Sequence, residues 1–210
     1  MDIKICGIST IEALDTAIEA GATHFGMVHF DKSPRHVSLD QARALRDHGK
    51  GRIKSVLLLV NQQPLPTGQA IEAVQPDVIQ FHGREAPDWV GIIREKLPMQ
   101  VWKARGVKDR GSLDKANEMY AGKVDRIVYD GVAGALPGGN GTLFDWSLLA
   151  DYPHRAPWIL AGGLTPENVA EGIRTTGADF VDASSGIESE PGVKDHGKIR
   201  AFCQAALEAA

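Results

Sequence analysis

Short apolar segments alternate with helix-forming segments along the whole of this 210-residue chain. The clearest apolar segment, residues 54–60, ends in an unbroken apolar run, as a parallel strand buried on both faces does. We expect further strands at residues 3–6, 24–30, 78–80, 101–104, 127–129, 158–161 and 180–182. A strand followed by a helix therefore recurs about every 26 residues, roughly eight times along the chain.

Helix start signals follow several of these strands. Ser9-Thr-Ile-Glu12 and Ser38-Leu-Asp-Gln41 both have the spacing of a capping box. Thr165 is expected to cap another helix, with Pro166 at its first helical position. Further helices are predicted around residues 42–47 and 86–95 and from about residue 195 onward.

The alternation limits the choice of fold. Strand–helix repeats without a long linker or a low-complexity tract favour one parallel sheet over two domains. The sequence therefore predicts an α/β fold, a single (β/α)8 TIM barrel over residues 1–210, at the short end for that fold. A doubly wound open sheet is the alternative that periodicity alone leaves open.

Charge and cysteine content narrow the class of protein. The net charge of −4 provides no basic excess for a polyanion, so we expect no nucleic-acid partner. Cys6 and Cys203 lie near opposite ends and imply no disulfide framework, which favours a reducing compartment. No signal-peptide run and no stretch of ~20 apolar residues is present, so no membrane partner is expected. We predict a cytoplasmic protein and leave monomer and homodimer open.

Two glycine-bearing turns follow the last two expected strands. They contain Gly162 and Gly163 in the first turn and Ser184, Ser185 and Gly186 in the second. Such turns present backbone N–H groups, and a helix N-terminus nearby adds partial positive charge. Because the loops after strands seven and eight of a barrel usually form a phosphate site, we predict a small phosphorylated ligand here.

Residues at the carboxyl ends of barrel strands share one mouth. A thiol, Cys6, and a carboxylate, Asp130, fall at such ends. Cys6 precedes Gly7 and a capped helix whose N-terminus favours the thiolate, although cysteine at a strand end is also a common small core residue. Asp130 precedes Gly131 and is equally typical of an ordinary turn.

Other polar side chains are expected at the same mouth. They are Arg35, Asn61, His82, Lys103 and Arg105. Lys103 and Arg105 are interpreted as cations at the barrel rim. The seven histidines have no metal-binding spacing, so no metal site is predicted. Residues 131–142 hold five glycines and are predicted to form a lid over the mouth.

Short motifs follow one another in a fixed order along nearly the whole chain. They are Lys4-Ile-Cys-Gly7, Ser33-Pro-Arg35, Val60-Asn61, Ile79-Gln-Phe-His-Gly83, Gly138-Gly-Asn-Gly141, Phe144-Asp-Trp146, Ala161-Gly-Gly163, Asp182-Ala-Ser-Ser-Gly-Ile-Glu188 and Pro191-Gly-Val-Lys-Asp195. Each motif is weak alone, but in this order the chain resembles the phosphoribosylanthranilate isomerases of tryptophan biosynthesis, which are (β/α)8 barrels. Asn140 and Gly131 depart from the residues usual at those positions in the family.

The resemblance implies an Amadori rearrangement without a cofactor. N-(5′-phosphoribosyl)anthranilate would become 1-(2-carboxyphenylamino)-1-deoxyribulose 5-phosphate. By similarity, Asp130 is the general acid and Cys6 is the general base. Charge and shape assign Arg35 to the anthranilate carboxylate, with a solvated surface arginine as the alternative. His82 is assigned to the aromatic pocket, with a structural histidine as the alternative, and the two glycine-bearing turns are assigned to the 5′-phosphate. A thiol that acts as a base near neutral pH leads us to expect a lowered pKa at Cys6.

Three other functions remain open at this point. The histidine-pathway isomerase performs the same rearrangement on a substrate with two phosphates, but its family has an aspartate where this chain has Cys6. A catalytically silent phosphoribosyl-ligand binder would need neither Cys6 nor Asp130. A phosphate-binding aldolase or epimerase would need a metal cluster or a Schiff-base lysine, for which Lys103 is the candidate.

Overall fold

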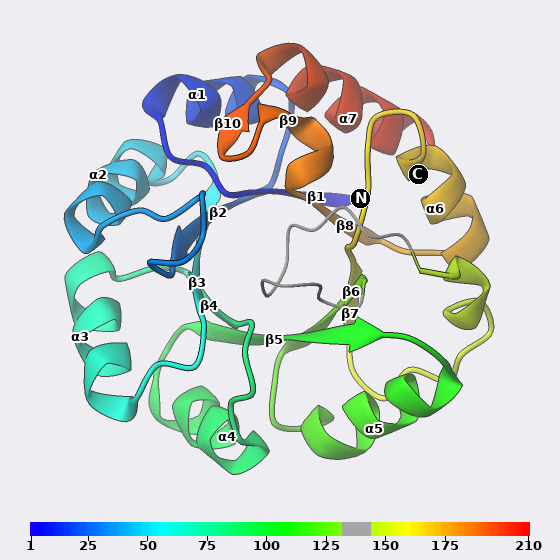
Figure 1. Cartoon of the computed structure of the whole chain (residues 1–210), viewed down its shortest axis with the longest axis horizontal. Helices are drawn as coiled ribbons and strands as arrows, with labels where there is room; N and C mark the ends of the chain where they lie inside the picture. The colour runs from blue at the N-terminus through cyan, green and yellow to red at the C-terminus, as the bar shows by residue number, and fades with distance from the viewer. Residues whose placement is uncertain (132–143) are drawn as a thin grey trace.

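A closed parallel barrel of eight strands forms the centre of the computed structural model, which describes residues 1–131 and 144–210 (Figure 1). The strands are β1 (Asp2–Cys6), β2 (His24–His29), β3 (Lys54–Leu59), β4 (Val78–Phe81), β5 (Gln100–Val107), β6 (Arg126–Gly131), β7 (Trp158–Leu160) and β8 (Phe180–Ala183). Each strand pairs with the next, and β8 pairs with β1 to close the barrel. This closure confirms the predicted barrel and excludes an open doubly wound sheet.

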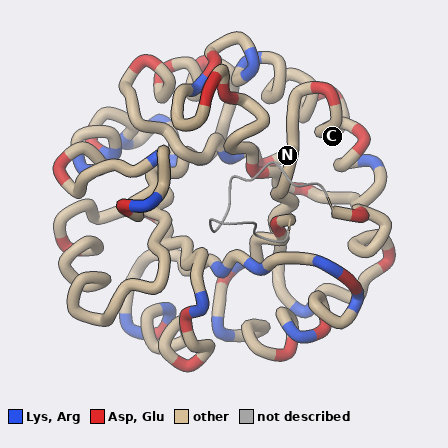
Figure 2. Tube along the Cα trace, viewed as in Figure 1, with Lys and Arg blue, Asp and Glu red and all other residues tan. Residues whose placement is uncertain are grey.

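Helices surround the barrel and carry much of the surface charge (Figure 2). They are α1 (Ile11–Glu19), α2 (Leu39–Gly49), α3 (Pro64–Val74), α4 (Pro87–Lys96), α5 (Arg110–Tyr120), α6 (Val169–Thr176) and α7 (His196–Glu208). A 3-10 turn, η1 (Trp146–Leu148), precedes β7; another, η2 (Ser185–Ile187), leads into the hairpin of β9 (Glu188–Glu190) and β10 (Val193–Lys194). None of the described helices is long and apolar enough to cross a membrane.

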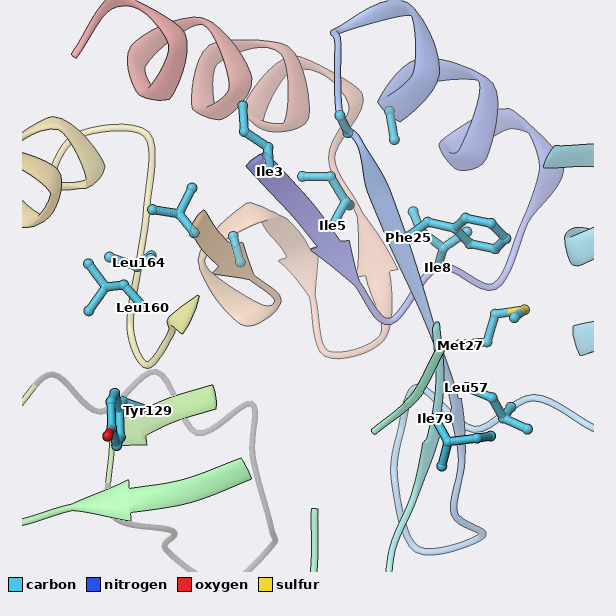
Figure 3. Close-up of a cluster of buried hydrophobic side chains, with 14 of the residues drawn as sticks. Ile3, Ile5, Ile8, Phe25, Met27, Leu57, Ile79, Tyr129, Leu160 and Leu164 are labelled. Atoms are coloured by element: carbon cyan, nitrogen blue, oxygen red, sulfur yellow. The ribbon is translucent and has the colours of Figure 1, made fainter. Parts of the chain in front are cut away.

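Alternation along each strand divides the side chains into two layers. Ile3 and Ile5 of β1 face the helices and join one large apolar cluster with Phe25 of β2 (Figure 3). The residues that alternate with these along each strand face the barrel interior, because successive side chains of a strand point to opposite faces. Trp102 and other apolar residues fill the interior toward the strand starts, which leaves the opposite end for a site.

The predicted capping boxes are only partly present. Ser38 caps α2 as expected, with its hydroxyl accepting from the Gln41 amide at 3.1 Å. The Gln41 side chain, however, donates to the Ser9 carbonyl at 2.7 Å, so the reciprocal bond of the box is not made. The box predicted at Ser9 is wrong by one residue, since Thr10 caps α1 by accepting from the Ala13 amide.

The helix after β7 begins later than predicted. Pro166 lies in a turn, and α6 starts at Val169 with Asn168 as its N-cap. The Asn168 side chain turns back instead, accepting from the Thr165 amide at 2.8 Å and donating to the Gly163 carbonyl at 3.0 Å. The Thr165 hydroxyl accepts from the Glu167 amide at 3.3 Å, so the residue predicted as the cap does bond the turn that precedes α6.

Candidate active site

A cavity opens at the carboxyl ends of the strands, with about 650 Å³ of space that is partly open to solvent. Every residue predicted for the site lines it: Cys6, Arg35, His82, Asp130, Gly162, Gly163, Ser184, Ser185 and Gly186. The mouth residues Asn61, Lys103 and Arg105 do not line it. The predicted lid falls almost wholly on residues 132–143, outside the described part of the chain.

Cys6 ends β1 in apolar surroundings. Its side chain belongs to a small buried cluster with Val28, Leu58 and Val60. Burial raises the pKa of the Cys6 thiol, and the Lys4 ammonium offsets only part of that rise. The expected lowering of this pKa is therefore wrong for the ligand-free protein, because apolar enclosure outweighs the nearby charges.

Lys4 and Asp182 form a buried ion pair behind the thiol. Lys4 is wholly buried, and its Nζ donates to Asp182 Oδ2 at 2.7 Å. Burial alone would lower the pKa of Lys4, but Asp182 and Cys6 outweigh burial and raise this pKa above its usual value, so the ammonium form persists at neutral pH. Asp182 also lines the cavity, where its Oδ1 has no hydrogen-bond partner among the described residues.

Asp130 lies one residue before the end of β6 and is held by its neighbours. Its Oδ1 accepts from the Gly131 amide at 2.8 Å, and its Oδ2 lies 3.3 Å from His82 Nε2. His82 Nδ1 lies 3.3 Å from the side-chain amide of Gln80. Asp130 therefore combines both interpretations of its sequence position: its carboxylate bonds the adjacent Gly131 amide, as in an ordinary turn, and it also lines the cavity.

Arg35 is fixed beside the cavity by a buried carboxylate. Its Nε and Nη2 donate to Glu188 Oε1 and Oε2, both at 2.7 Å, and Lys194 Nζ donates to Oε1 at 2.6 Å. Burial would raise the pKa of Glu188, but Arg35 and Lys194 outweigh it and hold that pKa below its usual value. Gly7 lies against this arginine, because a Cβ there would stand 2.6 Å from Arg35 Cδ. A solvated surface role for Arg35 is excluded.

The two glycine-bearing turns pack against each other at the mouth. Gly162 and Gly163 have φ of 82° and 67°, in the left-handed region that favours glycine. A Cβ on Gly186 would overlap the Leu164 carbonyl oxygen, so no side chain fits between the turns there. Their backbones therefore approach one another more closely than residues with side chains would permit.

Lys103 is buried and binds neighbouring backbone carbonyls and a carboxylate. Its Nζ donates to the carbonyls of Phe81, Gly83 and Ala104 and lies 3.1 Å from Glu85 Oε2. Lys103 is wholly buried, so its assignment as a rim cation is wrong, and it does not line the cavity as a Schiff-base lysine would. Within the described ranges, no three His, Cys, Asp or Glu side chains are grouped to hold a metal ion.

Polar side chains in and behind the cavity were missed at the level of sequence. Lys4, Gln80 and Asp182 lie inside strands, whereas candidates were sought at strand ends. A polar residue within an otherwise apolar strand was the available signal, as in Ile3-Lys4-Ile5. In a barrel, such a residue faces the interior and needs a partner there.

The closed barrel, with a thiol, a carboxylate and paired glycine turns at one mouth, defines a (β/α)8 enzyme of the kind that acts on small phosphorylated molecules. The family model described as N-(5′-phosphoribosyl)anthranilate (PRA) isomerase matches residues 3–205. The chain therefore belongs to the N-(5′-phosphoribosyl)anthranilate isomerase family, whose members are isomerases of tryptophan biosynthesis.

Individual relatives agree with this assignment. N-(5′-phosphoribosyl)anthranilate isomerase of Erythrobacter litoralis is 56% identical over 207 residues, covering 99% of both chains. A phosphoribosyl anthranilate isomerase solved in complex with reduced 1-(o-carboxyphenylamino)-1-deoxyribulose 5-phosphate is 32% identical, with a TM-score of 0.85 over 99% of both chains. A structure of monomers generated from the dimeric Thermotoga maritima enzyme is 33% identical, with a TM-score of 0.86 over 99% of both chains. The assignment to the phosphoribosylanthranilate isomerases is thus favoured over the histidine-pathway isomerase, the silent binder and the aldolase or epimerase.

Proposed function

We propose that the chain isomerises N-(5′-phosphoribosyl)anthranilate with Asp130 as general acid, Cys6 as general base and no cofactor. One observation carries these roles: the two side chains enter the same cavity from β6 and β1. These strands are three positions apart around the closed barrel. A sugar bound between them would therefore have one proton-transfer group on each side.

The first step opens the ribose ring. The Asp130 carboxyl gives its proton to the ring oxygen, and the C1′–O bond breaks with its electron pair on that oxygen. The anthranilate nitrogen then shares its lone pair with C1′ as an iminium. His82, at 3.3 Å from the same carboxylate, would keep the acid directed toward the ring.

The second step moves a proton from carbon. The Cys6 thiolate takes the proton from C2′, and the C–H electrons form a C1′=C2′ double bond while the iminium nitrogen becomes neutral. The resulting enol tautomerises, its hydroxyl losing a proton and C1′ gaining one, to give the 2′-ketone. The iminium accepts the electrons, so the step requires no cofactor as an electron sink.

Substrate groups would be divided among the remaining residues. The 5′-phosphate would meet the backbone of the glycine turns, in which Gly162, Gly163 and Ser184-Ser185-Gly186 line the cavity. The anthranilate carboxylate would meet Arg35, because a guanidinium matches a carboxylate in shape and charge. His82 and the apolar wall around Cys6 would contact the aromatic ring.

The decisive experiment follows the fluorescence of substrate made in place from anthranilate and phosphoribosyl pyrophosphate by a separate transferase. Cys6→Ser and Asp130→Asn should each reduce kcat by about a hundredfold or more and leave KM largely unchanged. Cys203→Ser is the matched control, since it makes the same atomic change at a buried thiol of α7. Near-full turnover by either site variant would disprove its assigned role.

The role of Arg35 has its own test. Arg35→Ala should raise KM more than it lowers kcat, because it removes a contact to a part of the substrate that does not react. Arg43→Ala on the exposed side of α2 is the matched control. Equal KM values for Arg35→Ala and the parent enzyme would remove Arg35 from the site.

We further propose that residues 1–210 act as one catalytic domain in the cytoplasm. A catalytic thiol must stay reduced, which favours a reducing compartment. The chain would act as a monomer or a homodimer, and light scattering of the purified protein distinguishes the two. A molar mass larger than that of a dimer would contradict this proposal.

A further inference from the structure

A permanent positive charge lies inside the barrel next to the proposed base. Lys4 alternates with Ile3 and Ile5, so its side chain faces the interior while theirs face the helices. It is wholly buried, and its ammonium is anchored by Asp182 Oδ2 at 2.7 Å. Asp182 belongs to β8, so the pair joins the first and last strands of the barrel.

The Lys4 side chain is a neighbour of the Cys6 thiol. Lys4 and Cys6 are two residues apart on β1 and therefore share its interior face. The charge of the ammonium partly offsets the burial that raises the pKa of Cys6, and the thiolate in turn raises the pKa of Lys4. Gly26 on β2 leaves room for both side chains, because a Cβ there would lie 2.9 Å from Cys6 Sγ and 3.0 Å from Lys4 Cε.

We propose that Lys4 is a positioning residue for the reaction, an ammonium held in place by Asp182 that stabilises Cys6 as a thiolate and keeps it directed into the cavity. The inference rests on the proposed role of Cys6 as the base. When the Cys6 thiolate takes the proton from C2′ it becomes a thiol, while Lys4 stays an ammonium and Asp182 a carboxylate, so that proton is the one gained by this group of three. A fixed cation is needed because the apolar wall beside Cys6 otherwise favours the neutral thiol.

Charged side chains from several strands surround Cys6 and set the direction in which each substitution shifts its pKa. Asp182 opposes ionisation of Cys6, whereas Lys194 of β10 favours it, and Lys4 has the largest effect of the three. Asp130 and His82 act on Asp182. Removal of Lys4 should therefore make the thiolate harder to form, and removal of Asp182 should make it easier.

Alkylation of the thiol by iodoacetamide, followed by mass spectrometry across pH, tests this directly. All proteins carry Cys203→Ala, so that Cys6 is the sole thiol. Lys4→Met should move the midpoint of the rate upward by about one pH unit or more, and Asp182→Asn should move it downward. If the pair only holds the strands together, the two variants should shift the midpoint together or leave it in place, which would overturn the proposal.

A double variant keeps the test valid if a single substitution prevents the protein from folding. The double variant Lys4→Met with Asp182→Asn removes both charges and leaves no unpaired buried ion. Its midpoint should still lie above that of the parent, because Lys4 affects the thiol more than Asp182 does. A midpoint equal to that of the parent in the folded double variant would also overturn the proposal.

Turnover gives an independent measure. In either Lys4 variant kcat should fall at pH 7 and recover as the pH rises, while KM stays within about twofold; a uniform fall at all pH values would contradict the proposal. The alkylation profile does not depend on turnover. If Cys6→Ser keeps its activity while Lys4→Met still shifts the alkylation midpoint, the base assignment fails and the effect of Lys4 on the thiol stands.

Discussion

His24, at the opposite end of the barrel from the cavity, should make the stability of this protein fall in mild acid. Its ring is buried between Trp102 and Phe180, with centroid distances of 5.3 and 4.8 Å, and its Nδ1 lies 2.8 Å from Thr23 Oγ1. Burial lowers the pKa of His24 to about 4, from 6.5 for a free histidine. The fold therefore accommodates the neutral ring and rejects the charged one.

The sign and size follow from proton binding. Between pH 6.5 and 4 the unfolded chain binds a proton at His24 and the folded protein does not, so acid favours unfolding. The contribution is complete above pH 6.5 and is lost as the pH falls toward 4. The difference between the two pKa values corresponds to about 3 kcal/mol, a large part of the stability of an ordinary domain.

Urea unfolding followed by circular dichroism from pH 8 to 4 measures this contribution. His24→Gln keeps a polar side chain of similar size that does not titrate. The free energy of unfolding of the parent relative to this variant should fall by about 3 kcal/mol between pH 7.5 and 4 and stay constant above pH 7.5. A difference that stays constant within about 0.5 kcal/mol throughout would refute the reasoning. Turnover at pH 7.5 should be the same in both proteins.

Three further substitutions test the site and its support. Gly26→Ala places a Cβ 2.9 Å from Cys6 Sγ, the sulfur of the proposed base, and should lower kcat by about tenfold to a hundredfold in the fluorescence assay. A normal kcat would show that the thiol can move. Glu188→Gln weakens the hold on Arg35 and should raise KM about tenfold, more than it changes kcat; an unchanged KM would contradict this. Lys103→Met leaves the Glu85 carboxylate unpaired and should cost about 3–5 kcal/mol in urea unfolding, and a loss below ~1 kcal/mol would mean that this pair contributes little.

The barrel could be predicted because its strands are continuous apolar runs with helices between them. The strand ends were less exact: β7 stops at Leu160, and β5 continues to Val107. Periodicity shows which residues are buried but not where the hydrogen-bond ladder stops. The start of α6 at Val169 was also missed, because Thr165 and Pro166 carry the signals of a helix start but lie in the turn before it.

The site was predictable where the fold places strand ends together. Cys6 and Asp130 follow from that rule, since each is the polar residue at the end of its strand. The partner of Lys4 was not predictable from spacing, because Asp182 is 178 positions away. The pKa of Cys6 was predicted in the wrong direction because its apolar wall comes from β2 and β3, which no local pattern near residue 6 reveals.

The bond between Lys4 and Asp182 also has a consequence for the order in which the protein matures. β1 is synthesised well before β8, so the surroundings of the Cys6 thiol are not complete until these two strands pair and close the barrel. Contacts between residues so distant in sequence form slowly, since a long loop must be closed before they contribute. A half-made or partly refolded chain would therefore carry Lys4 and Cys6 without the Asp182 carboxylate that fixes the ammonium in place. Catalytic activity in this protein should appear only with the finished ring.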